Sequence, residues 1–427
     1  MTKAKDRGLT EAAELLAKLQ QTLPTEVAGA LTPVARAADA EGWTLYLVGG
    51  CVRDLALGRD LLDVDLVAEG EVHSLAAAAA SALGGRLITH REFGTVTLEV
   101  EGARIDLAMA RAESYARPGA LPRVQPASIG EDLARRDFTV NALALAISGP
   151  ERGILLDPCK GWADLRRGVV RVLHPRSFVD DATRILRAIR YAVRLGFRLE
   201  AETRILLQRD VSYLDTISGA RVRQELLRLL AEERPEAVLL RCQQLGVLPA
   251  LHPALTFDRE LAAAFRAARR RAPLDPGLCL ALLGTRLSPQ EASAVAHRLA
   301  LTTRERRATE GGAALGCEIA GLAQARLRPS QAGARLEPYP EVSLHGWALV
   351  APSPTLRRRL RRYLDYWRYV KTDLDGRALE RLGVARGPMM GEALRMLRAA
   401  KLDGRVHNRN EEMAVVRSFL AGGGRSR

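Results

Sequence analysis

Aromatic residues and cysteines are scarce in this 427-residue sequence, and lysine is scarce among its charged residues. Aromatic side chains make up 4% of the chain, so the composition does not imply an extended surface for stacking bases. The five cysteines lie far apart, with neither metal-finger nor redox spacing, which favours reduced thiols in a cytoplasmic protein. The seven histidines show no metal-binding spacing. These absences argue against a disulfide scaffold, a zinc finger and a histidine metal site.

Long apolar runs are also missing. The first 20 residues are charged throughout, so we expect no secretory signal. The longest run of small apolar residues, 74–85, is too short and too rich in alanine to cross a bilayer, and it is typical of a closely packed helix. We therefore expect a cytoplasmic protein with no membrane partner. The sequence does not indicate its oligomeric state.

The charge of the chain is strongly positive. Its net charge is +14 and its isoelectric point is about 10.1, which favours a polyanionic partner such as nucleic acid. Only six of the 64 basic residues are lysines, however, and a strong arginine bias also arises from a GC-rich genome. Charge alone therefore leaves nucleic-acid binding and a compositional bias equally open.

Two regions of different periodicity follow a helical stretch at 1–42. The region 43–168 mixes strand and helix patterns, whereas helical spacing of apolar residues dominates from 177 onward. We therefore predict the α+β class, with a mixed β-sheet and helices in a small head and an all-helical remainder. Predicted strands lie at 43–48, 61–67, 95–100 and 103–110, and predicted helices of the head lie at 71–83 and 131–147.

Three aspartates alternate with apolar residues in two of the predicted strands. Asp63 and Asp65 stand two apart, so their carboxylates share one face of a strand, and Asp106 repeats the arrangement in a second strand. Carboxylates on one face repel one another unless a cation lies between them, and Mg²⁺ prefers such oxygen ligands together with substrate phosphates. The set predicts a two-metal site for phosphoryl transfer. The alternative for any single pair is a solvated strand face.

A glycine turn and an arginine-rich segment offer groups that bind phosphates. Gly49 and Gly50 separate a predicted strand from a predicted helix, where backbone N–H groups can hold phosphate oxygens. In the segment 135–145, arginines suit phosphates and an aspartate suits a ribose hydroxyl. An ordinary salt-bridged helix is the alternative for this segment. Its candidate residues are Arg135, Arg136, Asp137 and Asn141, with the last two on one helical face.

A further motif, "DDATR" at 180–184, combines a carboxylate with a guanidinium. Asp181 and Arg184 stand three apart, which makes them neighbours on a helix. The carboxylate accepts hydrogen bonds and the guanidinium donates them, so the pair can match the exocyclic amine and the ring acceptors of cytosine or adenine. Uracil and guanine present the wrong pattern to such a pair. Taken alone, the spacing is most often a salt bridge on a helix.

Five motifs in order resemble those of the class II tRNA nucleotidyltransferases, which comprise the CCA-adding enzymes and their bacterial poly(A) polymerase relatives. The resemblance covers roughly residues 43–230, and a weaker likeness to the family's C-terminal tail lies at 386–406. Five ordered motifs are a specific signal. They lie at 47–67, 135–145, 157–173, 180–197 and 219–230.

The resemblance implies a role for each motif. The family places catalytic metal on the D-x-D pair, here Asp63 and Asp65, and Asp106 is a further catalytic candidate. Asp180 stands where many members have glutamate, so the role of this first acid stays open. The residues implied in binding the triphosphate, ribose and base are Gly49, Gly50, Arg53, Arg135, Arg136, Asp137, Asn141, Asp180, Asp181, Arg184 and Arg187.

The same resemblance implies the fold, the substrates and the partner. The enzyme would add CCA to tRNA 3′ ends from CTP and ATP without a nucleic-acid template, with Mg²⁺ as cofactor. Its body and tail would hold the acceptor and T arms of tRNA by shape and phosphate contacts. The implied shape is seahorse-like. Its parts are an N-terminal extension at 1–42, a nucleotidyltransferase head at 43–168, a neck at 169–235, a body at 236–340 and a tail at 341–427.

Several alternatives stay open. Partial enzymes of the family add only CC or only A. Bacterial poly(A) polymerases carry a basic stretch where this chain reads "THREFGTVTL" at 89–98, which favours the tRNA enzyme. The segment 107–134 reads as a mobile loop of full length, as in enzymes that accept ATP. A non-catalytic RNA-binding protein is the alternative outside the enzymes, and the intact Asp63 and Asp65 argue against it.

Overall fold

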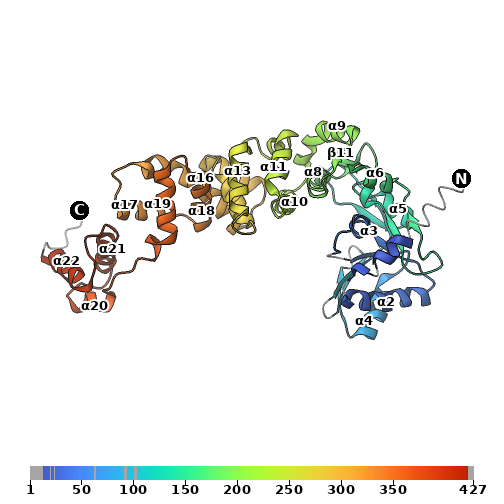
Figure 1. The fold of residues 1–427 in the computed structure, drawn as a ribbon, viewed down its shortest axis with the longest axis horizontal. Helices are drawn as coiled ribbons and strands as arrows, with labels where there is room; N and C mark the ends of the chain where they lie inside the picture. The colour runs from blue at the N-terminus through green and yellow to red at the C-terminus, as the bar shows by residue number, and fades with distance from the viewer. Residues whose placement is uncertain are drawn as a thin grey trace. The chain divides into compact units, whose positions relative to one another are not determined.

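The computed structural model, shown in Figure 1, describes residues 13–19, 21–23, 25–61, 64–90, 94–100 and 103–421. The chain divides into two compact units. The first comprises Met1–Arg221 with Leu245–Val247, and the second comprises Val222–Gln244 with Leu248–Arg427. No helix in the described part of the chain is long and apolar enough to cross a membrane.

The first unit is built on a seven-stranded sheet in the order β3-β4-β5-β2-β1-β8-β9. Neighbouring strands are antiparallel except for β2 and β5, which run parallel. A mixed sheet followed by helices confirms the predicted α+β class. The strands are β1 (Leu45–Val48), β2 (Val64–Ala68), β3 (Arg86–His90), β4 (Thr95–Val100), β5 (Ala103–Met109), β8 (Ala144–Ala146) and β9 (Leu155–Leu156).

Helices cover both faces of this sheet: α2 (Thr25–Ala40) and α4 (Val72–Leu83) lie on one face, and α5 (Ile129–Ala134) lies on the other. Leu45 and Leu47 of β1 belong to the core shared with α2 and α4. Tyr46 and Val48 alternate with them and enter a smaller core with α5. Because β1 is buried on both faces, its sequence is an unbroken apolar run.

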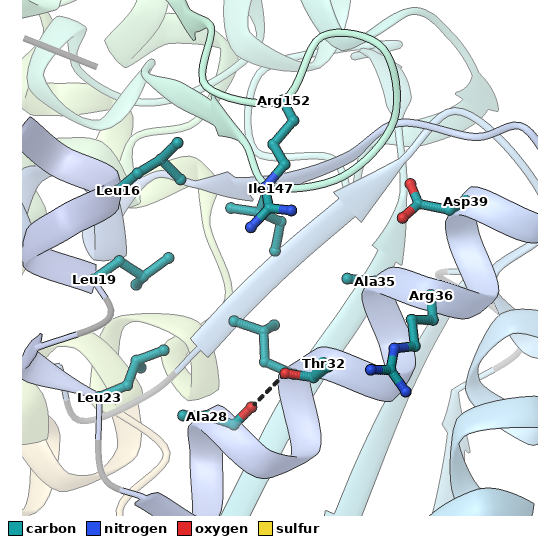
Figure 2. Close-up of a pocket in the computed structure, with 11 residues that line it drawn as sticks. Leu16, Leu19, Leu23, Ala28, Thr32, Ala35, Arg36, Asp39, Ile147 and Arg152 are labelled. Atoms are coloured by element: carbon teal, nitrogen blue, oxygen red, sulfur yellow. Dashed lines mark hydrogen bonds between the residues drawn. The ribbon is translucent and has the colours of Figure 1, made fainter. Parts of the chain in front are cut away.

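A helical segment at 13–19 packs beside α2. Leu15 and Leu19 join the core that α2 shares with the sheet. A cavity of about 330 Å³ lies between these segments, lined by leucines and by the polar side chains of Arg36, Asp39 and Arg152 (Figure 2). Of the predicted site residues that the structure describes, none lines this cavity.

The first unit contains further helices. They are α3 (Gly50–Ala56) after β1, then α6 (Gly161–Arg167), α7 (Ser177–Asp180), α8 (Thr183–Leu195) and α9 (Ala201–Asp210). In α8, Ile185, Leu186 and Ile189 are buried, as the apolar spacing predicts. A short parallel pair, β10 (Val169–Val170) and β11 (Arg198–Leu199), lies beside it. The prediction that strands end before residue 177 is therefore wrong for these two residues of β11.

From residue 222 onward, every element that the structure describes is helical. α14, α16 and α18 pack on one another, and α20, α21 and α22 share a separate apolar core. The helices are α10 (Gly219–Leu230), α11 (Pro235–Gln244), α12 (Val247–Leu251), α13 (Arg259–Arg269), α14 (Pro276–Gly284), α15 (Pro289–Arg298), α16 (Thr303–Ala323), α17 (Pro329–Leu336), α18 (Glu341–Val350), α19 (Pro354–Asp365), α20 (Gly376–Arg381), α21 (Pro388–Leu402) and α22 (Arg409–Ala421).

The predicted helix at 131–147 is wrong beyond Ala134. There α5 ends, and a 3₁₀ turn, η2 (Thr139–Asn141), leads into β8. In this segment Leu143 and Leu145 face the larger core, whereas the alternating Ala142, Ala144 and Ala146 face the smaller one. An alternation of period two between two apolar faces is the pattern of a strand buried on both sides.

The segment 107–134 is not a loop throughout. Its strands β6 (Arg111–Ser114) and β7 (Arg123–Pro126) pair as an antiparallel hairpin. Both strands are short and partly exposed, so they show no clear apolar alternation in the sequence. Within the predicted loop, residues 115–122 between these strands lie outside helix and strand, as do 110, 127 and 128 at the strand ends.

Candidate active site

Nine of the fourteen predicted site residues line one cavity of about 360 Å³ in the first unit. They come from the glycine turn, from β2, from the segment after α5 and from the segment around the start of α8. Most of the lining groups are charged. The nine are Gly50, Asp65, Arg135, Arg136, Asp137, Asn141, Asp181, Arg184 and Arg187.

One wall of the cavity is the turn between β1 and α3. Gly49 has a φ of 66°, a conformation that residues with a Cβ rarely adopt. An added Cβ at this position would also collide with the guanidinium of Arg136. The Gly49 N–H donates to the carbonyl of Leu143 at 3.0 Å, which ties the turn to the segment before β8. Gly49 therefore shapes the turn, and Gly50 is the glycine that lines the cavity.

Arg53 lies buried behind this cavity and does not line it. Its side chain is 3% exposed and donates to both carboxylate oxygens of Asp54, at 2.9 and 2.8 Å. It also donates to Oδ1 of Asn141 and lies 5.0 Å from the ring centre of Tyr191. These contacts make Arg53 a positioning residue for Asn141 and Tyr191.

Arg135 and Arg136 are held by a buried carboxylate that is not among the predicted site residues. Asp132 in α5 is fully buried and accepts from Nη2 of Arg135 at 2.6 Å and from Nη2 of Arg136 at 2.9 Å. Burial alone would raise the pKa of Asp132, but the charges of Arg136 and Arg135 hold it below its usual value. The spacings of three and four residues are a signal that could have identified this contact.

Asp137 and Asn141 contact each other, although not on a helix as predicted. Nδ2 of Asn141 donates to Oδ1 of Asp137 at 2.9 Å across η2. Oδ2 of Asp137 accepts from Nε of Arg187 at 2.9 Å. Burial would raise the pKa of Asp137, but the charge of Arg187 and the bond from Asn141 outweigh it and lower the pKa. Asp137 is therefore ionised near neutral pH.

Asp181 and Arg184 both line the cavity, but the prediction that they share a helix is wrong. α7 ends at Asp180, Asp181 is extended with φ −140° and ψ 99°, and α8 begins at Thr183. Oδ1 of Asp181 accepts from the N–H and the hydroxyl of Thr183, at 3.0 and 2.7 Å, and from Arg221 at 2.9 Å. Among the described residues, no hydrogen-bond donor to Oδ2 is found, so this oxygen can accept from a ligand.

The guanidinium of Arg184 is fixed by two bonds. It donates to Oγ of Ser177 at 2.9 Å and to the carbonyl of Arg135 at 2.8 Å. The described contacts thus replace the i,i+3 salt bridge that a helix would offer. Asp180 does not line the cavity and lies instead near Arg176, with 3.6 Å between the charged atoms.

Asp65 and Asp106 lie directly beside each other on the parallel strands β2 and β5. Paired residues of neighbouring strands point to the same face of a sheet, so the two carboxylates stand together. Asp65 is exposed between two buried neighbours and lines the cavity. The hydroxyl of Thr97 on β4 donates to Oδ1 of Asp106 at 2.5 Å. Asp63 lies outside the described residues.

The adjacent carboxylates fit a divalent cation. They supply the hard oxygen ligands that Mg²⁺ prefers, beside a cavity whose arginines suit the phosphates that would share the ion. Within the described ranges, no group of three or more His, Cys, Asp and Glu side chains is placed to hold a metal on its own. Asp65 and Asp106 therefore need further oxygen ligands from elsewhere, such as a bound nucleotide.

Three cavity residues were missed: Glu113, Tyr115 and Tyr191. The hydroxyl of Tyr115 donates to Oε2 of Glu113 at 2.9 Å, and Glu113 pairs with Arg135. The ring of Tyr191 lies 5.5 Å from the guanidinium of Arg187. Tyr191 follows Arg184 by seven residues, and this helical spacing could have indicated it. Glu113 and Tyr115 lie in the segment without a clear period, which gave no signal.

Two family models match the chain. Residues 45–171 match the model described as "Poly A polymerase head domain". Residues 196–258 match the model described as "Probable RNA and SrmB- binding site of polymerase A". The first range contains the glycine turn, the paired carboxylates and the arginine motif.

Curated relatives cover most of the chain. An A-adding tRNA nucleotidyltransferase of Halalkalibacterium halodurans is 32% identical over 88% of this chain and 88% of that protein. A CC-adding tRNA nucleotidyltransferase of Deinococcus radiodurans is 33% identical over 88% of this chain and 89% of that protein. The chain spans about half of another relative, an A-adding enzyme of Geobacter sulfurreducens, which is 30% identical over 94% of this chain and 48% of its own length.

A solved structure has the same fold along nearly the whole chain. It is the Thermotoga maritima CCA-adding enzyme complexed with tRNA-CCA, which is 29% identical, with a TM-score of 0.78. The match covers 95% of this chain and 98% of that one.

Proposed function

We propose that this chain, which belongs to the family of tRNA nucleotidyltransferases and bacterial poly(A) polymerases, adds CCA to the 3′ ends of tRNA from CTP and ATP. The observation that carries the proposal is the single cavity in which Asp65 stands with the arginine motif and with Asp181 and Arg184. A nucleoside triphosphate bound there would meet a metal ligand, phosphate-binding groups and base-reading groups at once. Protein side chains would then select the base, without a template.

The proposed reaction is a nucleotidyl transfer. The oxygen of the RNA 3′-hydroxyl forms a bond to the α-phosphorus of the nucleoside triphosphate. The bond between that phosphorus and the oxygen that bridges to the β-phosphate breaks, pyrophosphate leaves, and the hydroxyl proton passes to solvent. Mg²⁺ on Asp63 and Asp65, when bound, would neutralise charge on the phosphates. Asp106 is the third carboxylate of this site.

The remaining residues of the cavity would bind the nucleotide. Arg135 and Arg136, fixed by Asp132, are suited to the phosphates because their guanidiniums are already oriented. Asp137 would accept from a ribose hydroxyl. The Gly49–Gly50 turn would bind phosphate oxygens through the backbone of Gly50, the glycine that lines the cavity. Asn141 would contact the nucleotide from the cavity wall, Arg53 would support Asn141 from behind, and Arg187 would hold Asp137.

Base selection would rest on Asp181 and Arg184. Oδ2 of Asp181 would accept from the exocyclic amine of cytosine or adenine, since the described donors all bind Oδ1. Arg184 would donate to the ring acceptors. Uracil and guanine would leave these groups unpaired, which costs about 1–3 kcal/mol per buried group. Asp180 stays a candidate for base selection, in which it would support Asp181 from outside the cavity.

Addition of the terminal A alone is the second candidate activity. Two of the relatives above carry the name A-adding, and both match most of this chain. The β6–β7 hairpin, present here with Tyr115 in the cavity, supports the acceptance of ATP in either case. The CC-adding relative keeps CC addition as a further alternative, and poly(A) synthesis and non-catalytic RNA binding are weaker ones.

The C-terminal helices would bind the acceptor and T arms of the tRNA. On α19, Arg358, Arg361 and Arg362 are exposed along one helical face, and none has a carboxylate partner among the described residues. Tyr366 and Tyr369 follow them and are 66% and 62% exposed. Guanidiniums bind phosphates and exposed aromatic rings stack on bases, so this face suits RNA.

We propose that the chain comprises an extension at 1–42, a head at 43–168, a neck at 169–235, a body at 236–340 and a tail at 341–427. The segment at 13–19 and α2 share a core with the sheet, so the extension would stabilise the head. We also propose a cytoplasmic location, where tRNA and nucleoside triphosphates are available, and leave the oligomeric state open.

Incubation of the full chain with tRNA transcripts that lack one, two or three 3′ nucleotides tests the proposal. CTP and ATP are supplied separately and together with Mg²⁺, and the products are resolved at single-nucleotide length. Complete CCA addition supports the proposed function, and growth only of the transcript that ends in CC supports A addition. If no transcript grows with any nucleotide, the proposed function is wrong.

A further inference from the structure

A second cavity of about 240 Å³ meets the candidate active site at Gly50 and Asp65. Its remaining walls come from α3, from the segment after α3 and from the end of α8. None of the predicted base-reading residues lines it. The two cavities are therefore neighbours that share the glycine turn and the metal-binding carboxylate but differ in their other groups.

One face of α8 borders both cavities. Arg184, Arg187 and Tyr191 line the nucleotide cavity, and Arg194 lines the second one. These residues stand at intervals of three, four and three, which places them along one side of the helix. At a rise of 1.5 Å per residue, Arg194 lies about 15 Å beyond Arg184 along the helix. A ligand in the second cavity would thus continue along the helix from a nucleotide in the first.

The second cavity has two guanidiniums that no described carboxylate neutralises. Arg53 binds Asp54, so these two charges compensate each other. The described side-chain bond of Arg59 is a long one, from Nη2 to the carbonyl of Arg194 at 3.5 Å, and Arg194 itself is exposed. Asp60 is an exposed carboxylate in the same cavity. The cavity therefore offers donors for phosphate oxygens and an acceptor for a hydroxyl.

We propose that the second cavity binds the 3′-terminal nucleotide of the RNA, with Arg59 and Arg194 on its phosphodiester groups and Asp60 on a ribose hydroxyl. This inference rests on the proposed function. In-line transfer requires the attacking hydroxyl and the leaving pyrophosphate on opposite sides of the α-phosphorus. A nucleotide in one cavity and an RNA end in the other would meet at Asp65, where the metal ion is expected. Guanidinium groups suit the phosphodiester oxygens.

The experiment measures steady-state transfer of AMP to a tRNA that lacks only its terminal A, by the full chain. The RNA is prepared twice, once with a normal last phosphodiester and once with a neutral methylphosphonate there. The variants are Arg59→Gln and Arg194→Gln, with Arg59→Lys and Arg194→Lys as conservative replacements. Arg204→Gln is the control, because Arg204 is an exposed arginine of α9 that lines neither cavity.

We expect each glutamine variant to raise the KM for the normal RNA about tenfold and to leave the KM for ATP within about twofold, because a charge-assisted bond is lost on the RNA side only. For the parent, the KM for the methylphosphonate RNA should be about tenfold higher than for the normal RNA. For the glutamine variants, the same replacement should raise the KM less than about threefold. The lysine variants should recover part of the loss, and Arg204→Gln should match the parent. Circular dichroism checks that each variant is folded.

Any one of four outcomes overturns the inference. If the glutamine variants keep the KM of the parent for RNA, Arg59 and Arg194 do not bind it, and the proposed function still stands. If they raise the KM for ATP instead, the second cavity belongs to the nucleotide. If the methylphosphonate raises the KM for RNA of the glutamine variants as much as that of the parent, the two arginines do not bind this phosphate. If the parent itself transfers no AMP, the proposed function is wrong, and this inference, which rests on it, is wrong as well.

Discussion

Arg187 of α8 binds Oδ2 of Asp137 with both Nε and Nη2, at 2.9 and 2.7 Å. Asp137 belongs to the motif at 135–145, and Arg187 follows the proposed base-reading residues, so one ion pair joins two motifs whose paired residues stand 50 positions apart. Asp137 is 8% exposed, and Asn141 occupies its other oxygen. The pair therefore fixes the wall of the cavity against which a ribose would lie.

Arg187→Gln should destabilise the first unit by about 2 kcal/mol, because it leaves the buried carboxylate of Asp137 with less compensation. The estimate is below the range for fully buried pairs because the Arg187 side chain is 28% exposed. Urea unfolding monitored by circular dichroism measures the change. The double variant with Asp137→Asn removes both charges and should recover part of the loss. Equal losses in the single and double variants would contradict this account of the pair.

Acid should weaken the same contact. The folded pKa of Asp137 is lowered, so its contribution to stability is present above the unfolded pKa of about 4 and is lost as the pH falls through the folded value. The free energy of unfolding of the parent should therefore fall more between pH 6 and about pH 3 than that of Asp137→Asn. Identical pH dependence in the two proteins would show that Asp137 is not stabilised as a carboxylate.

Arg184→Ala should weaken base choice more than triphosphate binding. The guanidinium is one half of the proposed base-reading pair, and loss of a paired polar group at a recognition edge costs about 1–3 kcal/mol, or roughly 5- to 150-fold in discrimination. Incorporation of CMP, AMP, UMP and GMP at matched concentrations measures it. Ser177→Ala is a useful companion, because it removes only one support of Arg184. An Arg184→Ala variant that rejects UTP and GTP as strongly as the parent would refute the assignment.

The tip of the β6–β7 hairpin should influence addition of the terminal A. Gly119 has a φ of 76°, and an added Cβ there would collide with the carbonyl of Thr216. Arg221 donates to the Gly119 carbonyl at 3.4 Å and to Asp181 at 2.9 Å, so the tip contacts a residue that holds the base reader. Replacement of 117–121 by glycines leaves both strands intact.

This replacement should spare incorporation of C and suppress incorporation of A by about tenfold or more, a loss of about 1.4 kcal/mol. Single-nucleotide extension with CTP or ATP measures both rates. Leu121→Gly is the control, because that side chain is 70% exposed. Equal losses with CTP and ATP would mean that the hairpin only stabilises the cavity. If the parent adds C but never A, the activity of the chain is CC addition and not CCA addition.

The arginine face of α19 should carry part of the affinity for tRNA. The triple variant Arg358→Gln, Arg361→Gln and Arg362→Gln should weaken binding and reduce the slope of log Kd against log salt by about 2, since each phosphate contact contributes about 0.7–0.9. The KM for ATP should not change. A matched triple variant removes three exposed arginines that have carboxylate partners: Arg228, Arg386 and Arg405. If the two triple variants weaken tRNA binding equally, the arginines of α19 contribute only through the net charge of the chain.

The sequence predicted the strands that carry the carboxylates, because their local alternation agrees with the folded sheet. Asp65 alternates with buried neighbours as expected, and Asp106 lies beside it. The strand β8 was misread because alanine and leucine are strong helix formers, whereas burial between two cores decides its conformation. Such burial on both faces depends on residues distant in the chain.

The site was predictable in the kinds of residues that it gathers and not in how they are held. Arg135 and Arg136 were predicted site residues and line the cavity, but Asp132, which fixes them, was missed because its burial appears only in the fold. Arg53 lies behind the cavity, although its motif suggested contact with the triphosphate. The break between α7 and α8 at Asp181 was also invisible in a sequence with continuous helical spacing.

The most direct test of the central claim is the rate at which Asp65→Ala extends a tRNA that lacks its 3′ end, measured beside its affinity for that tRNA. Loss of a metal ligand should cost several kcal/mol of transition-state stabilisation, so the rate should fall at least about a thousandfold. The Kd for tRNA should stay within about twofold, and Glu99→Ala on β4 should match the parent. If Asp65→Ala extends the tRNA within tenfold of the parental rate, the cavity is not the site of nucleotidyl transfer.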